Sequence, residues 1–256
     1  MSSEPSAAAP RIALVTGAGS GIGKAVALCL AANGFTVVAC GRTRATLDET
    51  LSAARDPARL VAIPADIGDP ASVEGLFAEI ERRFGRIDLL FNNAGIAAPA
   101  EPLDQADIAA WQRVLDINLT GAFLCSRAAF ALMKRQDPRG GRIINNGSVA
   151  AHVPRPNSAA YAASKHALTG LTKATALDGR PFGIACGQID IGNASTRLGD
   201  THAEGSLQAD GRLLAEPVFA VEHVASTVLH MASLPLDVNI PFLTLMATGM
   251  PYMGRG

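Results

Sequence analysis

Tyr161 and Lys165 are the two residues whose types and spacing give this sequence its clearest capacity for acid–base chemistry. They stand four positions apart in the segment 159–178, whose apolar residues recur at helical spacing, so both side chains fall on one face. A free phenol has a pKa of about 10, and a neighbouring ammonium favours its ionised form. The spacing also fits a tyrosine and a lysine on an ordinary surface helix. Ser148, just past a predicted strand, favours the catalytic interpretation because its hydroxyl could hold a substrate oxygen beside the phenol.

A glycine-rich turn, TGAGSGIG from Thr16 to Gly23, follows the first predicted strand and opens a helix at its last glycine. Three of its glycines permit positive φ and remove the Cβ atoms that would block close backbone approach. A pyrophosphate can therefore rest on the amides of the helix N-terminus. The turn predicts a dinucleotide cofactor, which we expect to contact Gly17, Ser20, Gly21, Ile22 and Gly23.

The end of the second predicted strand indicates which nicotinamide nucleotide is bound. An acid at this place bonds the adenosine ribose of NAD, and its carboxylate would repel a 2′-phosphate. Gly41 stands there instead and Arg42 follows, which leaves room for a phosphate and a guanidinium to bind it. We therefore predict NADP(H) rather than NAD, the alternative being that Arg42 is only a solvated charge. Asp66 could bond the adenine amino group or cap the helix after it, although Asp69 is better placed as the cap.

Short apolar runs alternate with longer segments of helical periodicity along the chain. Strands that alternate with helices imply βαβ crossovers, and continuous apolar runs indicate helices on both sheet faces. The predicted fold class is α/β, a Rossmann-like doubly wound parallel sheet of seven strands. The strands are expected at 11–16, 36–40, 60–64, 87–91, 142–146, 184–191 and 241–247. The helices are expected at 23–33, 70–84, 107–136, 159–178 and 221–232.

Composition argues against several classes of protein. Twenty-two Lys and Arg residues oppose 23 Asp and Glu residues, so no net charge favours nucleic acid or an anionic membrane as a partner. By inspection no apolar stretch reaches the length of a membrane span. The four cysteines lack C-x-x-C spacing, so neither a disulfide framework nor a metal site is predicted. Residues 1–10 are expected to be a disordered leader and 11–256 a single domain of a cytoplasmic protein.

The candidate motifs occur in a fixed order. They are the T-G-x-x-x-G-x-G turn, Asp66, the N-N-A-G run from Asn92 to Gly95, Asn118, Ser148, and Tyr161 with Lys165. Because these motifs occur in this order, nearly the whole sequence resembles the single-domain branch of the short-chain dehydrogenase/reductase family. The resemblance implies a homotetrameric oxidoreductase that moves a hydride between a nicotinamide and a small carbonyl or secondary alcohol. It implies a catalytic tetrad of Asn118, Ser148, Tyr161 and Lys165.

The resemblance also implies roles for single residues. Ser148 would hydrogen-bond the substrate oxygen while Tyr161 donates its proton, and Lys165 would also bind the nicotinamide ribose. Asn118 would support a water that links Lys165 to solvent, whereas Asn92 is expected to stabilise the sheet. The cofactor contacts implied beyond the glycine turn and Arg42 are Asp66, Ile67, Asn93, Ala94, Gly95, Tyr161, Lys165, Ala194 and Thr196.

The sequence departs from the family pattern at the sixth predicted strand. The family usually carries Pro-Gly after this strand, whereas this chain has Ile191-Gly192 before Thr196. The strand also carries Gln188 and Asp190 where a central parallel strand should be apolar, and a buried carboxylate is costly unless it is paired. Either these two side chains form a structural polar network, or Asp190 tunes the site behind the nicotinamide.

The resemblance places the substrate near Ala150, His152, Asn193 and a loop to Pro217 whose sparse apolar pattern indicates a mobile lid. His152 could be a specificity contact or an ordinary, partly exposed loop residue. The Met- and Gly-rich segment 239–256 is expected to pack in a core or a subunit interface. One alternative function is a 3-oxoacyl-thioester reductase. The other is a nucleotide-sensing protein without turnover, against which the complete tetrad argues.

Overall fold

Seven parallel strands form the central sheet in the computed structural model, which describes residues 10–196 and 205–253. Across the sheet the strands lie in the order β3-β2-β1-β4-β5-β6-β9, and every neighbouring pair is parallel. All seven predicted strands are present, which confirms the predicted fold class. Their bounds are β1 Ile12–Thr16, β2 Thr36–Gly41, β3 Leu60–Pro64, β4 Leu89–Asn92, β5 Gly141–Asn146, β6 Ile184–Ile191 and β9 Phe242–Leu245.

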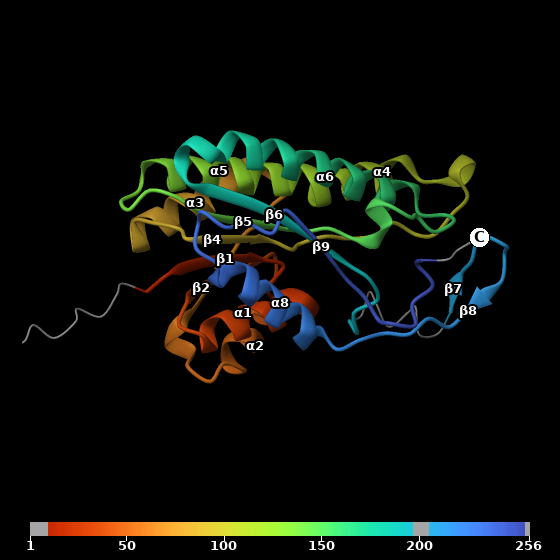
Figure 1. The fold of residues 1–256 in the computed structure, drawn as a ribbon, viewed down its shortest axis with the longest axis horizontal. Helices are drawn as coiled ribbons and strands as arrows, with labels where there is room; N and C mark the ends of the chain where they lie inside the picture. The colour runs from red at the N-terminus through yellow and green to blue at the C-terminus, as the bar shows by residue number, and fades with distance from the viewer. Residues whose placement is uncertain (1–9, 197–204, 254–256) are drawn as a thin grey trace, which may run out of the picture.

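Helices cover both faces of this sheet (Figure 1). On one face, α1 and α8 bury apolar side chains such as Leu30 and Val228 against the strands. On the other, α3 and α5 do the same with side chains such as Ile80 and Met133. The inner strands are therefore mainly apolar, and every residue of β1 and β6 is buried, including Gln188 and Asp190 of β6. The helices are α1 Gly21–Ala32, α2 Arg44–Ser52, α3 Pro70–Phe84, α4 Ile108–Leu115, α5 Ala122–Arg135, α6 Ala159–Gly179 and α8 Val221–Ser233.

The segment 107–136, predicted as a single helix, is interrupted. A π-helical turn, Asp116–Gly121, separates α4 from α5 and contains Asn118. Such turns occur often at functional sites, and apolar periodicity does not reveal them. Helix α2 was not predicted, because it is short and buries only Leu47 and Thr50.

The helical run Ile108–Arg135 is long and apolar enough to cross a membrane, so the expectation that no stretch reaches that length is wrong. Only 39% of its most apolar window is buried within this chain. The run packs along α3 and α6, and a core helix of a globular protein makes contacts of the same kind. One such helix among the described residues is weak evidence for a membrane span.

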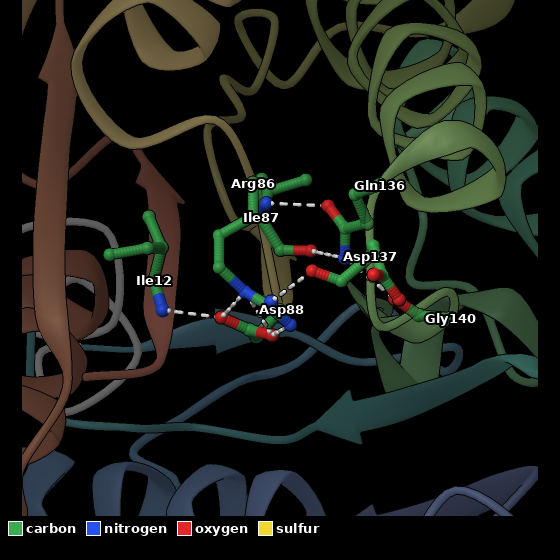
Figure 2. Close-up of polar contacts among 7 residues, drawn as sticks. All are labelled: Ile12, Arg86, Ile87, Asp88, Gln136, Asp137 and Gly140. Atoms are coloured by element: carbon green, nitrogen blue, oxygen red, sulfur yellow. Dashed lines mark hydrogen bonds and ion pairs between the residues drawn. The ribbon is translucent and has the colours of Figure 1, made fainter. Parts of the chain in front are cut away.

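A polar cluster at the amino end of β4 fixes the start of that strand (Figure 2). The Asp88 carboxylate accepts hydrogen bonds from the Ile12 amide and the Arg86 guanidinium, each at 2.7 Å. The buried side chain of Gln136 accepts from the Ile87 amide and donates to the Ile87 carbonyl, both at 2.9 Å. The amide at the start of β1 and both backbone polar groups of Ile87, just before β4, are thereby satisfied.

The loop after β6 is described in part. Residues 197–204 of the predicted lid lie outside the described residues, as do residues 1–9 of the predicted leader and residues 254–256. The strands β7 Ser206–Leu207 and β8 Leu213–Leu214 form a small antiparallel pair. An isolated bridge between Ala194 and Phe219 then ties the end of this loop to the segment that follows β6. The predicted lid thus has a structured base on the described side.

Candidate active site

A cavity of about 1190 Å³ opens at the carboxyl ends of the parallel strands. Its lining comes from the segments that follow β1, β2, β3, β4, β5 and β6, together with α6, the base of the lid and the C-terminal segment. Ligands bind at this end of an open parallel sheet, because the loops that follow the strands converge there. The predicted site residues are therefore expected to reach this cavity.

Tyr161, Lys165 and Ser148 all line the cavity. Tyr161 is half-buried near the start of α6, and the Lys165 ammonium lies 5.6 Å from the centroid of its ring. Lys165 Nζ donates a hydrogen bond of 2.6 Å to the Asn146 carbonyl at the end of β5. This bond holds the buried ammonium beside the phenol, as the helical spacing predicts.

Ser148 begins a short 3-10 turn, Val149–Ala151, immediately after β5. Its Oγ accepts a hydrogen bond of 3.1 Å from the Ala150 amide, and its own amide donates at 3.0 Å to Asp190 Oδ1. Both the backbone and the side chain of Ser148 are therefore fixed. The hydroxyl hydrogen remains available for an oxygen atom in the cavity.

Asn118 lies behind the cavity rather than on its lining. Its Oδ1 accepts from the Ile96 amide at 2.8 Å, and its Nδ2 donates to the Ile96 carbonyl at 2.9 Å. Nδ2 also donates to Ser164 Oγ at 3.1 Å, directly before Lys165. The side chain thus joins the π turn to the loop after β4 and to α6, so it positions other groups.

The glycine turn fits the phosphates of a dinucleotide. Gly17 has φ of +67°, and a Cβ there would lie 2.9 Å from Ala94 Cα, so only glycine allows this close approach. Ser20 caps α1 without a side-chain hydrogen bond, which leaves amides of the first turn facing the cavity. Gly17, Ser20, Gly21 and Ile22 line the cavity. Gly23 does not, because it packs against the Gly17 carbonyl.

The end of β2 brings Arg42 to the cavity. Its side chain is exposed, and among the described residues it forms no ion pair. A Cβ at Gly41 would make only ordinary contact with Leu47, so steric crowding does not require glycine here. Asp66 and Ile67 also line the cavity. Asp66 Oδ1 accepts from the Gly68 amide, whereas Asp69 caps α3 through the Ala71 and Ser72 amides, as expected.

The segment after β4 lies along the same cavity. Asn93, Ala94 and Gly95 line it, and the Thr16 hydroxyl accepts from the amides of Asn93 and Ala94. Asn92 points away, and its Nδ2 donates to Asn145 Oδ1 and Ser126 Oγ inside the fold. Ala194 and Thr196 line the far side, where Thr196 Cγ2 would lie 3.2 Å from a Cβ at Gly21.

A buried ionic cluster joins the lid base to the segment after Ser148. The Arg155 guanidinium pairs with the Glu216 carboxylate and donates at 3.0 Å to Asn193 Oδ1. Asn193 and Gln208 also donate to Glu216. Burial alone would raise the pKa of Glu216, but the hydrogen bonds from Gln208, Asn193 and Arg155 hold that pKa below its ordinary value. The Arg155 charge that faces the cavity is thereby neutralised.

Some, but not all, of the substrate-facing residues inferred from the sequence line the cavity. Ala150 and Asn193 line the cavity, whereas His152 lies outside its lining with its ring against Asp190. Leu207, in the predicted loop to Pro217, lines the cavity as expected, whereas sequence reasoning missed Trp111, Val153, Arg155, Met250 and Tyr252, which also line it. No local motif marks these residues. In the C-terminal segment, Ala247 and Met250 pack against Val149, so the described part of 239–256 does contribute to a core.

Comparisons with known proteins agree with this geometry. The family model for short chain dehydrogenases matches residues 11–206. A 3beta-hydroxysteroid dehydrogenase of Mediterraneibacter gnavus is 35% identical over 246 residues, covering 87% of this chain and 88% of that protein.

Solved structures carry the same fold. The closed form of a serine dehydrogenase complexed with NADP+ has a TM-score of 0.83 at 28% identity and covers 96% of this chain and 98% of that one. A 3-ketoacyl-(acyl-carrier-protein) reductase from Brucella melitensis complexed with NADH has a TM-score of 0.81 at 27% identity, with coverages of 93% and 97%. The chain belongs to the short-chain dehydrogenase/reductase family, and it is an NAD(P)-dependent oxidoreductase that acts on CH–OH groups.

Proposed function

We propose that this protein is an NADP(H)-dependent oxidoreductase that interconverts an uncharged, largely apolar ketone and its secondary alcohol, with Tyr161 as the proton-transferring residue. One observation carries the proposal. Tyr161 and Ser148 line the same cavity as the glycine turn, and the Lys165 ammonium is held 5.6 Å from the Tyr161 ring. The phenol, a hydroxyl donor and the nucleotide cradle therefore share one space.

In the proposed reaction, Ser148 Oγ donates a hydrogen bond to the substrate oxygen and orients it toward Tyr161. Tyr161 Oη gives its proton to that oxygen during reduction and takes it back during oxidation. Lys165 stabilises the ionised phenol by charge, and its bond to the Asn146 carbonyl keeps the ammonium in place. Asn118 holds the π turn against α6. The bound nicotinamide supplies the hydride chemistry.

The preference for an uncharged substrate rests on the cavity beside Ser148. Its side chains there include Val149, Val153, Leu207 and Met250, and the charge of Arg155 is cancelled by Glu216. Among the described lining residues, the Arg155 cation is paired with Glu216, and the Lys165 ammonium is bound to the Asn146 carbonyl beside Tyr161. A substrate carboxylate lying against the apolar side chains would therefore lose its hydration without gaining an ion pair from them. We expect alicyclic ketones to be better substrates than keto acids.

A panel of carbonyl substrates distinguishes this function from that of an acyl-thioester reductase. The alternative is tested because the chain is similar to a 3-ketoacyl-(acyl-carrier-protein) reductase. The panel is cyclohexanone, 2-decalone, a 3-ketosteroid, a 2-keto acid and acetoacetyl-coenzyme A, each followed by NADPH absorbance. We expect the alicyclic ketones to give the highest kcat/KM. A clear preference for the thioester would favour the alternative reductase.

NADP(H) is proposed because Arg42 lies at the cavity with no ion pair to any described residue, and because no acid ends β2. Replacing Arg42 with alanine is expected to raise the Kd for NADPH by about 10- to 100-fold, since one charge-assisted hydrogen bond to the 2′-phosphate is lost. The Kd for NADH should stay within about threefold. Fluorescence titration measures both values.

Arg44 offers a matched control for the Arg42 experiment. It is an exposed arginine two residues away that pairs with Asp48 at 2.8 Å and does not line the cavity. Arg44→Ala should leave the ratio of the two dissociation constants near the wild-type value. A wild-type preference for NADH that persists in Arg42→Ala would remove the NADP(H) assignment.

The assembly and extent of the protein stay predictions. We propose a cytoplasmic homotetramer whose residues 11–256 form one domain. The exposed apolar side chains of Ile108 on α4 and Phe123 on α5 support a subunit contact through these helices. Light scattering with an expected mass of four chains tests the assembly, and a monomeric mass would reject it.

A further inference from the structure

Asp190 is a buried carboxylate near the carboxyl end of its strand that the proposed reaction does not use. It lies on β6, is 1% exposed and does not line the cavity. Oδ1 accepts from the Ser148 amide at 3.0 Å and from Gln188 Nε2 at 2.7 Å, and Oδ2 contacts His152 Nε2 at 2.9 Å. Two of these three contacts reach the segment that carries the Ser148 hydroxyl.

The surrounding chain is shaped to admit this carboxylate. A Cβ at Gly147, the residue before Ser148, would overlap Asp190 Oδ1 and lie 2.7 Å from Gln188 Nε2. Glycine at this position therefore lets β5 and the Asp190 side chain come together. A carboxylate whose only role was to have its own hydrogen bonds satisfied would not require a glycine next to Ser148.

A buried polar chain holds Asp190 from the other side. Gln188 Nε2 also donates to Thr169 Oγ1, and Gln188 Oε1 accepts from Thr172 Oγ1, both on α6. Thr172 Oγ1 in turn accepts from Asn145 Nδ2 on β5. These bonds leave the carboxylate little freedom to turn, so its oxygen is a fixed acceptor for the Ser148 amide.

We propose that Asp190 is a positioning residue that sets the place of Ser148 Oγ through the Ser148 amide. The inference rests on the proposed function, in which that hydroxyl orients the substrate oxygen. Loss of the acceptor frees the turn that begins at Ser148, and an error of about 1 Å at a reacting group can lower turnover by about 100-fold. Both sequence hypotheses for Asp190 then hold together, because the structural network ends on the active-site turn.

A double-mutant cycle tests the inference. The substrate is cyclohexanone, or another carbonyl of the panel if the wild-type protein reduces that one faster than cyclohexanone. With this substrate, Asp190→Ala is expected to lower kcat by about 10- to 100-fold. Its Kd for NADPH should stay within about threefold. Asp190→Asn, which keeps Oδ1 as an acceptor, should restore kcat to within about threefold of wild type. In a Ser148→Ala background, Asp190→Ala should lower kcat by less than about threefold, because Ser148 no longer transmits the effect.

Gln136→Ala is the matched control. Gln136 is a buried polar side chain with three hydrogen bonds, like Asp190, but it lies at the amino end of β4 (Figure 2). Its loss should lower the melting temperature and leave kcat within about threefold. Asp190→Ser, which is smaller but polar, serves if Asp190→Ala does not fold.

The outcomes separate the two claims. If Ser148→Ala retains wild-type kcat, the proposed function fails and this inference fails with it. If Ser148→Ala is impaired but the Asp190 variants keep wild-type kcat, or if their losses multiply with that of Ser148→Ala, only the positioning role is overturned.

Discussion

Tyr161→Phe is expected to lower kcat by about 100- to 10,000-fold, because the variant loses the phenolic hydroxyl that exchanges a proton with the substrate oxygen in the proposed reaction. The aromatic ring stays, so the contact with the Lys165 ammonium and the packing at the start of α6 are preserved. NADPH affinity and the melting temperature should therefore remain close to wild type. Steady-state kinetics with the panel ketones, fluorescence titration and thermal unfolding measure the three quantities.

Two outcomes of this experiment would be informative. A variant that keeps wild-type kcat would remove Tyr161 from the reaction. A variant that loses NADPH binding together with kcat would instead show that the hydroxyl serves the nucleotide, since Tyr161 lines the same cavity. Only a loss of kcat with binding retained agrees with proton transfer.

Gly147→Ala is expected to destabilise the protein by about 1–3 kcal/mol and to lower kcat, because its Cβ has no space beside Asp190 and Gln188. For a chain of this length that loss corresponds to a fall in melting temperature of about 2–12 °C. Thermal unfolding measures the stability change, and ketone reduction measures kcat. Ser148 is the next residue, so the two effects should appear together.

A second substitution, at Asp190, tests which side chain crowds the new Cβ. Gly147→Ala combined with Asp190→Ala removes the atom nearest the new Cβ, so stability should recover relative to Gly147→Ala alone. Gly75→Ala is the matched control, because a Cβ at this helical glycine meets nothing within 4 Å. It should be neutral or stabilising by up to about 1 kcal/mol. Equal melting temperatures for Gly147→Ala and wild type would contradict the crowding.

The fold was predictable because the strands are short, mainly apolar runs that alternate with helical segments along the chain. Buried β1 shows this most clearly. The misses have physical reasons. Helix α2 is polar and two of its nine residues are buried, so periodicity gives a weak signal. The π turn Asp116–Gly121 changes the hydrogen-bond pattern without changing the apolar pattern, and the predicted helix continued through it.

The candidate site was also predictable only in part. Residues close in sequence, such as Tyr161 with Lys165 or the glycine turn, could be predicted because local spacing fixes their geometry. Contacts between distant residues could not. Arg155 meets Glu216 across 61 positions, and His152 meets Asp190 across 38. Sequence placed His152 near the substrate, whereas its ring lies on Asp190, outside the lining of the cavity.

The most direct test is a crystal structure of the protein with NADP+ and the alcohol of its best panel ketone. We expect the alcohol oxygen within about 3 Å of both Tyr161 Oη and Ser148 Oγ, on the nicotinamide side of the cavity. We also expect the 2′-phosphate to lie against Arg42. A nucleotide bound elsewhere, or a Tyr161 hydroxyl turned away from the alcohol oxygen, would contradict it.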